Sequence, residues 1–402
     1  ALNLQPNARF TTIAFSDIVN NAASWAASNF QGATSNTVTD STIFNPSNNA
    51  VYIQAGAHAN FFQRSTITVN VDFAAFYVTA SASTTLSGSY VQNLAGHGVF
   101  FDAGAVHGRV MGSTVVVTMA ARNALHLLGA SSNTVTTSVL RNTLGNAVNI
   151  NTASNANTVS GSSVTALAGG ACAVALSGSS SNTIATSYLY GAGAALCLSA
   201  GAVRGTVSVS TLTSPNDALT VTGSSSNTFT GSWIWGGGDG ARFDGGSSGN
   251  TVRLSTVIGA TGYGLTIAQS TSNWVYGSYV QGSTAAFITG STATVIGGTV
   301  LVATNTFGEA LSFSDGSRSL NLSSSTLLAG SRGAGLMLKG GGAGLINVST
   351  NIFMVGARNG VYVATQTAGT QVWITSNTIS VSTGPLNTSG IRLEGLLTGA
   401  TI

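Results

Sequence analysis

The chain has 402 residues, of which 51 are glycine, and only 6% are charged, where about 25% is usual for a soluble domain. Thirteen basic and ten acidic residues give a net charge of +3 and are scattered along the chain. The scatter excludes the clustered basic surface of a nucleic-acid-binding protein. The sequence has no run of 18 apolar residues, the length that a membrane-spanning helix needs. So little charge favours a secreted protein that is part of an assembly over a free cytosolic one.

The first 35 residues are expected to form a separate N-terminal segment. Residues 16–30, SDIVNNAASWAASNF, are the one good helix candidate, with Ser16 or Asp17 as its N-cap. Its apolar stripe comprises Ile18, Val19, Ala22, Trp25 and Ala26. We expect this helix to follow an extended segment and to cover the open edge of the fold after it. No signal peptide precedes it, which indicates the mature form of an extracellular or cell-surface protein.

A repeat begins at residue 36, and in it a serine is followed two positions later by an aliphatic residue. Eleven serines lie 22 to 25 residues apart: Ser41, Ser65, Ser89, Ser113, Ser138, Ser163, Ser187, Ser210, Ser232, Ser255 and Ser278. Two positions further on are Ile43, Ile67, Val91, Val115, Leu140, Thr165, Leu189, Leu212, Ile234, Val257 and Val280. Since alternate strand residues point to opposite sides, we expect this second set to form the core.

A turn of the form SSNTV precedes these strands. Its Asn position is occupied by Asn36, Asn133, Asn157, Asn182, Asn227, Asn250 and Asn273. In GAVHGRV (104–110) and GAVRGTV (201–207) a glycine replaces the asparagine. Because both residues tolerate left-handed backbone, we expect each to supply it at a tight corner. A further strand of the form G-A-x-apolar-x-apolar follows, as at Leu125 and Leu127.

This period, the β-branched strands and the corners predict an all-β chain. We expect a single parallel β-helix of about 15 coils of 22–25 residues over residues 36–402, after a short capping helix within residues 1–35. In its SSNTV and GSSSNTI turns the chain resembles the right-handed parallel β-helix proteins of the pectate-lyase-like superfamily, over roughly residues 36–395. The resemblance implies the fold and no particular chemistry, because lyases, hydrolases, phage tailspikes, adhesins and filament proteins share this architecture.

The two cysteines lie 25 residues apart, about one coil, a spacing that suits a stacked disulfide. The register argues against it. The matched repeats place Cys172 in phase with inward Val174, whereas Cys197 falls between inward Leu196 and Leu198. We therefore expect two free thiols.

Acidic residues are scarce, and we interpret most of them as turn residues. Asp239, Arg242 and Asp244 are the best candidates for a catalytic cluster, since polysaccharide-cleaving enzymes of this fold need grouped carboxylates. The motif GHG at 96–98 resembles a short motif of polygalacturonases, but the paired Asp and the R-x-K stretch of that family have no counterpart here.

His97, Asp102 and His107 share one coil, and His126 lies in the next. Such an arrangement can hold a metal ion, but exposed or turn histidines are far commoner. We therefore expect no metal site and no cofactor.

The neighbours of the aliphatic residues are predicted to face outward and to form an aromatic strip. The strip comprises Tyr90, Tyr188, Tyr190, Trp233, Trp235 and Tyr279. Contiguous exposed apolar surface of this kind indicates an interaction site. Four interpretations stay open: a neighbouring copy packs on it, sugar rings stack on it, a flat threonine row beside it binds ice, or loops of the same chain cover it.

We favour a structural function. The predicted protein is a non-enzymatic, self-assembling subunit of an extracellular filament, sheath or surface layer, which associates through these faces and through open coil ends. The alternative is a glycan-binding adhesin or a tailspike-like polysaccharide-degrading enzyme. The expected partners are further copies of the chain, then a cell-surface or extracellular glycan.

Overall fold

The computed structural model describes residues 1–356, 358–364, 366–367, 369–382, 389–394 and 400–401. These residues form 50 β-strands, and none of them lies in a helix that could cross a membrane. The chain divides into two units, residues 1–211 (unit 1) and residues 212–402 (unit 2). Both are β-solenoids, with about 16 turns in all.

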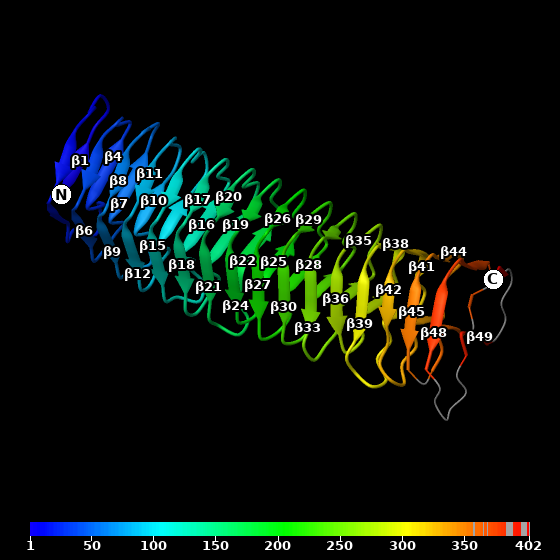
Figure 1. Cartoon of the computed structure of the whole chain (residues 1–402). Coiled ribbons are helices and arrows are strands. Elements are labelled where there is room, and N and C mark those ends of the chain that lie inside the picture. The colour runs from blue at the N-terminus through cyan, green and yellow to red at the C-terminus, as the bar shows by residue number, and fades with distance from the viewer. Residues whose placement is uncertain (357, 365, 368, 383–388, 395–399, 402) are drawn as a thin grey trace. The chain divides into compact units, whose positions relative to one another are not determined.

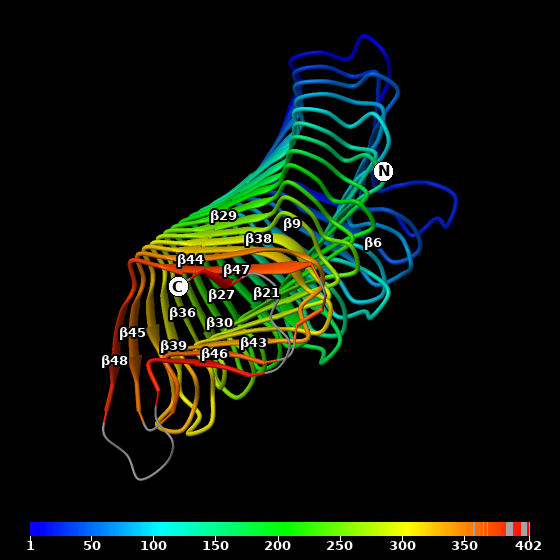
Figure 2. The same ribbon diagram turned by 90° about the vertical axis from the view of Figure 1, so that its right-hand side faces the viewer.

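Unit 1 is a stack of coils, each of which contributes one short strand to each of three parallel sheets (Figures 1 and 2). The first sheet contains β1 (Leu2–Leu4), β4 (Ser28–Gln31), β7 (Val51–Gln54), β10 (Phe76–Val78), β13 (Val99–Phe101), β16 (Leu125–Leu128), β19 (Val148–Asn151), β22 (Cys172–Ser177) and β25 (Ala194–Ser199). The second contains β2 (Thr12–Ala14), β5 (Thr37–Thr39), β8 (Phe61–Gln63), β11 (Thr85–Ser87), β14 (Arg109–Met111), β17 (Thr134–Thr136), β20 (Thr158–Ser160), β23 (Thr183–Ala185) and β26 (Thr206–Ser208). The third contains β3 (Asp17–Val19), β6 (Thr42–Asn45), β9 (Thr66–Val69), β12 (Tyr90–Asn93), β15 (Thr114–Val117), β18 (Val139–Asn142), β21 (Ser163–Ala166) and β24 (Tyr188–Gly191), and β27 (Thr211–Ser214) lies at the unit boundary.

Unit 2 has the same three rows of strands. Its first sheet contains β28 (Leu219–Thr222), β31 (Ala241–Asp244), β34 (Leu265–Ala268), β37 (Ala286–Thr289), β40 (Leu311–Ser314), β43 (Leu336–Lys339), β46 (Val361–Val363) and β49 (Ile391–Leu393). The second contains β29 (Thr228–Thr230), β32 (Thr251–Arg253), β35 (Trp274–Tyr276), β38 (Thr292–Gly297), β41 (Arg318–Ser323), β44 (Gly344–Ser349), β47 (Thr370–Thr375) and β50 (Ala400–Thr401). The third contains β30 (Trp233–Gly236), β33 (Thr256–Gly259), β36 (Tyr279–Gly282), β39 (Val300–Ala303), β42 (Thr326–Leu328), β45 (Ile352–Val355) and β48 (Thr378–Val381). Much of the C-terminal tail, where we expected an open coil end, lies outside the described residues, at 395–399 and 402.

The core of each unit lies between the three sheets and consists of alternate strand residues. In the third sheet Ile43 and Ile67 of unit 1 and Ile234 of unit 2 are fully buried, whereas the residues beside them lie on the outer face. One repeat was misaligned. The buried residue of β21 is Val164, not Thr165, and the serine of that coil is Ser162.

The corners between the second and third sheets of unit 1 have the same length in every coil. Two residues connect the strands, as Asp40 and Ser41 connect β5 and β6. Asp40 has left-handed backbone (φ 52°), and the amide of buried Ser41 donates to Oγ of Ser65 in the next coil at 3.3 Å. This constant corner fixes the register of the third sheet and accounts for the serine repeat.

The corners between the first and second sheets carry the row of asparagines. All seven predicted turn asparagines, Asn36, Asn133, Asn157, Asn182, Asn227, Asn250 and Asn273, are buried there. Oδ1 of Asn157 accepts hydrogen bonds from the amide N (2.9 Å) and Nδ2 (3.1 Å) of Asn133. The left-handed residue is the one before the asparagine, with φ 56° at Ala156. The asparagine is therefore required for its side-chain hydrogen bonds and not, as we expected, for its backbone.

Gly108 replaces the asparagine of one coil for a steric reason. A Cβ at this position would lie 2.6 Å from Cε1 of buried Phe101 and 2.8 Å from Oδ1 of Asn133. The Gly108 amide still donates to Asn133 Oδ1 at 2.7 Å. The exchange makes room for Phe101 and keeps the hydrogen bond between coils.

The capping helix predicted over residues 16–30 is absent, although all of these residues are described. Their ends are strands: β3 pairs with β6, and β4 pairs with β1 and β7. The apolar spacing comes from a strand on each side of a loop, because Ile18 and Ala27 are buried while Trp25 is 65% exposed. Helix propensity is a weak signal, and backbone pairing with the next coil overrides it. Residues 1–35 are therefore part of the solenoid.

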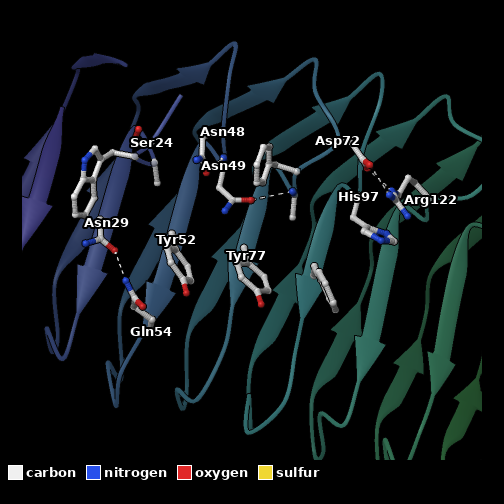
Figure 3. A pocket seen from close by; sticks show the side chains of 15 residues that line it. Ser24, Asn29, Asn48, Asn49, Tyr52, Gln54, Asp72, Tyr77, His97 and Arg122 are labelled. Carbon is white, nitrogen blue, oxygen red and sulfur yellow. Dashed lines mark hydrogen bonds and ion pairs between the residues drawn. The ribbon is translucent and has the colours of Figure 1, made fainter. Parts of the chain in front are cut away.

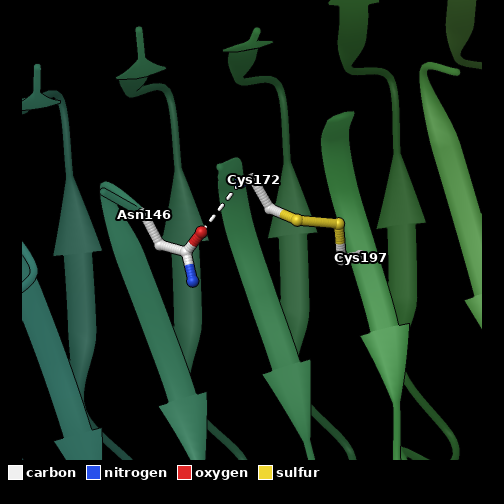
Figure 4. Close-up of a disulfide and its surroundings, with 3 residues drawn as sticks. All are labelled: Asn146, Cys172 and Cys197. Atoms are coloured by element: carbon white, nitrogen blue, oxygen red, sulfur yellow. Dashed lines mark hydrogen bonds between the residues drawn. A yellow bond between two sulfur atoms is a disulfide. The ribbon is translucent and has the colours of Figure 1, made fainter. Parts of the chain in front are cut away.

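Cys172 and Cys197 form a disulfide, with their Cα atoms 6.1 Å apart (Figure 4). The prediction of two free thiols was wrong because strict alternation fails in β22. Ala173 and Val174 are both fully buried, so Cys172 turns to the outer face. There it meets Cys197, which lies on the outer face of β25.

We expect Asn157→Ala to lower the free energy of unfolding by about 3 kcal/mol. The change leaves the amide and Nδ2 of Asn133 and the carbonyl of Ala130 without their buried partner, and such groups cost about 1–3 kcal/mol each. Denaturant unfolding followed by circular dichroism measures the loss. The control is Thr158→Ala, whose half-buried side chain faces outward and whose removal should cost under about 0.5 kcal/mol. Equal stabilities for the two variants would contradict the role of the asparagine row.

The disulfide predicts the thiol content of the purified protein. Thiol titration in denaturant should find no free thiol before reduction and two after it, because the structure pairs Cys172 with Cys197. The double variant Cys172→Ser/Cys197→Ser should give none in either state. Two reactive thiols in the unreduced protein would contradict the pairing.

Candidate functional site

A groove of about 560 Å³ lies in unit 1, over the first sheet and the loops that enter it from the third sheet (Figure 3). Its strand residues are Asn29, Tyr52, Gln54, Tyr77 and Phe100. Its loop residues are Ser24, Trp25, Ala26, Asn48, Asn49, Asp72, Phe73, Ala74, His97 and Arg122. We call this site the unit 1 groove. Its volume, its apolar walls and its few polar groups are typical of a ligand-binding site.

The loops from the third to the first sheet are the variable part of the coil. In unit 1 they range from two residues (192–193) to eight (20–27), whereas the corners between the second and third sheets always have two. Five successive loops, between residues 20 and 124, line the groove. At roughly 4.8 Å per coil the groove therefore extends about 20 Å along the unit.

The motif GHG places His97 in the groove wall. Fully buried Asn93, at the end of β12, donates from Nδ2 to the His97 carbonyl at 2.9 Å and accepts at Oδ1 from the Gly96 amide at 2.8 Å. A Cβ on Gly96 would lie 1.9 Å from the carbonyl oxygen of Phe73. The glycine is thus needed for the close contact between neighbouring loops.

A row of aromatic rings forms the floor of the groove. Tyr52, Tyr77, Phe100 and His126 occupy the same outward position in successive coils, where each is opposite the next. The first three line the groove, and His126 continues the row beyond it. The ring centroids are 5.1 Å apart for Tyr52 and Tyr77 (15° between planes), 5.2 Å for Tyr77 and Phe100 (36°), and 4.7 Å for Phe100 and His126 (11°). The rings therefore cover one another's faces and present mainly their edges to the groove.

Tyr52 is the last ring of the row, and a polar patch follows it. The next residue in the row is Asn29, which is 5% exposed. Gln54 Nε2 donates to Asn29 Oδ1 at 3.0 Å (Figure 3). Asn29 Nδ2 in turn donates to Asn3 Oδ1 at 3.1 Å. The face of Tyr52 turned away from Tyr77 thus adjoins fixed amide groups instead of another ring.

Tyr77 is held by a carboxylate at the edge of the first sheet. Its hydroxyl donates to Asp102 Oδ2 at 2.5 Å. Burial, then this hydrogen bond to the carboxylate, raises the pKa of Tyr77 well above its usual value. Burial and the charge of Asp102 also raise the pKa of Tyr52. Both phenols keep their protons and can donate hydrogen bonds.

Two imidazoles, His97 and His126, lie side by side with ring centroids 4.7 Å apart. Burial, reinforced by His126 and Arg122, lowers the pKa of His97 to about 3, and burial lowers the pKa of His126. His97 Nδ1 accepts from the Asn123 amide at 3.1 Å, and His126 Nε2 lies 3.3 Å from Asn151 Oδ1. Both rings are therefore neutral near pH 7. His97 lines the groove and His126 packs against it, so neither is the exposed turn residue that we expected.

Asp72 and Arg122 form an ion pair at the groove rim (Figure 3). Nε of Arg122 lies 2.5 Å from Asp72 Oδ1, and its Nη2 lies 2.6 Å from Oδ2. The two residues come from loops 50 residues apart, so the pair spans the loop that carries His97. The guanidinium lowers the pKa of Asp72, which stays ionised.

The catalytic candidates predicted from the sequence lie in unit 2, outside this groove. Arg242 and Asp244 form a partly exposed ion pair at 2.8 Å. Asp239 is buried, and its carboxylate accepts hydrogen bonds from the Tyr263 amide and from Thr266 Oγ1, both at 2.8 Å. Burial raises the pKa of Asp239, and its hydrogen bonds are those of a residue that fixes a turn.

The predicted aromatic strip lies on the outer face of the third sheet in both units. Tyr90, Tyr188 and Trp233 are 39%, 45% and 47% exposed, and Tyr190, Trp235 and Tyr279 are half-buried. Between Tyr90 and Tyr188 the same outward position carries Thr114, Val139 and Ser163. The strip in unit 1 is therefore interrupted.

Sequence reasoning missed the groove, although its signal was present. The four residues of the aromatic row each stand between the two inward residues of a first-sheet strand, in the segments VYI, FYV, VFF and LHL. Their common register was detectable once the repeat had been aligned. The loops that complete the groove have no repeated pattern.

Two family models match the chain. The "Right handed beta helix region" matches residues 3–144, and the "Periplasmic copper-binding protein (NosD)" matches residues 106–293. None of the curated protein sequences matches it. A copper site requires several ligating side chains that meet at one point. Within the described residues no three His, Cys, Asp or Glu side chains gather in this way, and both cysteines are in the disulfide, so the residues present do not fit copper.

Solved structures with a similar fold include enzymes and a phage tailspike. A periplasmic alginate epimerase, AlgG, is 10% identical with a TM-score of 0.36, over 84% of this chain and 77% of the epimerase. DFA-IIIase from Arthrobacter chlorophenolicus A6 is 12% identical with a TM-score of 0.42, over 89% and 90% of the two chains. Tailspike protein 2 of an Escherichia coli O157:H7 bacteriophage is 12% identical with a TM-score of 0.35, over 76% of this chain and 38% of the tailspike.

The repeat and the three parallel sheets make the chain a parallel β-helix repeat protein, and the family model for the right-handed β-helix matches its residues 3–144. At these identities the likeness to solved structures shows the fold alone. The expectation that the chain is not an enzyme is not supported by these comparisons.

His97 makes a testable contribution to the acid sensitivity of folding. Its pKa is about 3 in the folded protein, below the ordinary 6.5, so the unfolded chain binds the proton more strongly. The stability contributed by the neutral ring is therefore lost as the pH falls from about 6.5 towards about 3. His97→Asn, which keeps an acceptor for the Asn123 amide, should lose less stability than the wild type between about pH 6.5 and pH 4 in denaturant unfolding. His58→Asn, at an exposed site outside the groove, should retain the wild-type pH profile.

Proposed function

We propose that the protein is exported and binds a carbohydrate chain in the unit 1 groove. The observation that carries the proposal is the combination of an aromatic row with fixed amides in a groove about 20 Å long. A sugar ring has apolar faces and a rim of hydroxyl groups. Aromatic side chains with a polar end suit such a ligand, since they provide apolar contact and a hydrogen bond together.

The end of the row at Tyr52 offers the best sugar position. Among the described residues, Asn29 and not another ring adjoins the face of Tyr52 turned away from Tyr77. Trp25 lines the same groove and is 65% exposed. The amides of Asn29 and Gln54 lie beside Tyr52. A pyranose or furanose ring placed here can contact an aromatic face while its hydroxyls meet the amide groups.

This site favours the glycan-binding alternative over the filament subunit that we first preferred. The aromatic strip on the third sheet, on which self-assembly was predicted, is broken in unit 1 by Thr114, Val139 and Ser163. The groove residues are continuous over successive coils. Self-association remains a prediction from the sequence, and the groove requires no second copy.

Export from the cytosol is supported by the disulfide of the chain. A disulfide on the outer face of the first sheet persists in an oxidising compartment and is rare in the cytosol. The name of the matching NosD family, a periplasmic protein, points the same way. A cell-surface or extracellular glycan is then the ligand that the protein meets.

The proposal is tested by measuring glycan binding to wild type, Tyr52→Ala and Trp25→Ala. We expect a glycan array to find a ligand and calorimetry to show at least tenfold weaker binding by each variant, about 1.4 kcal/mol. The matched control is Trp233→Ala, which removes a similarly exposed tryptophan outside the groove and should bind like the wild type. Loss of binding in Trp233→Ala alone would move the site to the third sheet, and no binding to any glycan would refute the proposal.

A further inference from the structure

We infer that the unit 1 groove selects an uncharged glycan and discriminates against uronate polymers. This inference rests on the proposed carbohydrate function and adds the class of ligand. It follows from the state of each charged or ionisable group that faces the groove.

Arg122 is the one arginine or lysine among the fifteen residues that line the groove, all of which are described. Asp72 accepts from Nε and Nη2 of Arg122 in a bidentate arrangement, and Nη1 lies 3.4 Å from the Ala121 carbonyl oxygen, so the guanidinium charge is already paired with a carboxylate. A sugar carboxylate that approached Arg122 would be repelled at close range by the negative charge of Asp72. Arg122, the cation that an acidic sugar would need, is therefore already paired with Asp72.

The remaining groups of the groove provide no positive charge. His97 and His126 are buried against each other and against Phe100, an environment that disfavours the imidazolium form. Asp102, which holds Tyr77, adds a negative charge at the edge of the aromatic row. Near neutral pH the groove thus has no net positive charge to attract a polyanion.

The other polar groups of the groove are uncharged dipoles. Asn48 and Gln54 offer amide groups, and Tyr52 offers a phenol that remains protonated. Hydroxyl groups both donate and accept, so they match this set. A carboxylate accepts only, and burying one here would leave its charge without a partner.

Calorimetry with two families of oligosaccharides tests the inference. The neutral family is a set of β-glucan and fructan oligomers, and the acidic family is a set of oligogalacturonates and oligomannuronates. We expect the wild type to bind its best neutral oligomer at least tenfold more tightly than any acidic one, at low and at moderate salt. Equal or tighter binding of an acidic oligomer, weakened by salt, would overturn the inference and leave the carbohydrate function intact. No binding of either family would instead contradict the proposed function.

Asp72→Asn separates the role of the ion pair from the shape of the groove. Asp72 is 64% exposed at its side chain, so the fold should tolerate the change, and the variant frees Arg122. We expect acidic oligomers to bind this variant about tenfold more tightly than the wild type. The matched control is Asp40→Asn, which frees Arg64 from a similar bidentate pair outside the groove and should leave both families unchanged. An unchanged affinity of Asp72→Asn for acidic oligomers would overturn the assignment of selectivity to the pair.

Discussion

Parallel stacking of coils puts every side chain against its counterparts in the coils before and after it, at roughly 4.8 Å. Each position must therefore hold a side chain that packs or hydrogen-bonds with its own kind. Within the core this constraint selects aliphatic residues, and at one corner it selects asparagines such as Asn133 and Asn157, which bond to each other. On the outer face it aligns Tyr52 with Tyr77, so the binding floor is a product of this register. The disulfide is not, because the strand register pairs Cys172 with Ala194 and Cys197 with Ala175.

The three corners of a coil do not contribute equally to fixing the register between coils. The two-residue corner with its serine fixes the register in each coil of unit 1, and the other corner adds to it in the coils that carry the asparagine. The third corner, from the third sheet to the first, is left free to vary from two to eight residues. Variation in loop length costs little there because the strands on either side are already held. The groove lies at this corner, where the fold tolerates change.

Much of the fold could be predicted from the sequence because residues at equivalent positions of successive coils recur at a regular spacing. The serine and aliphatic positions led to the inward face, including Ile234 between two tryptophans. Features that break the period could not be predicted. Two consecutive buried residues in β22 reversed the orientation of Cys172, and a one-residue shift moved the inward position of β21 from Thr165 to Val164. The helix over 16–30 failed because its local spacing also fits a strand, a loop and a strand.

The candidate site was missed for a related physical reason: its residues become neighbours only through stacking. Asp72 and Arg122 are 50 residues apart and meet because loops two coils apart reach over the loop that carries His97. A stacked row hides ring faces, and at its Tyr52 end the last ring adjoins the amides of Asn29 and Gln54. In a chain with few charges, the one arginine of the groove is paired with Asp72, and burial keeps His97 neutral. Recognition then depends on shape and on uncharged dipoles, which is the form of recognition that a sugar without carboxylates requires.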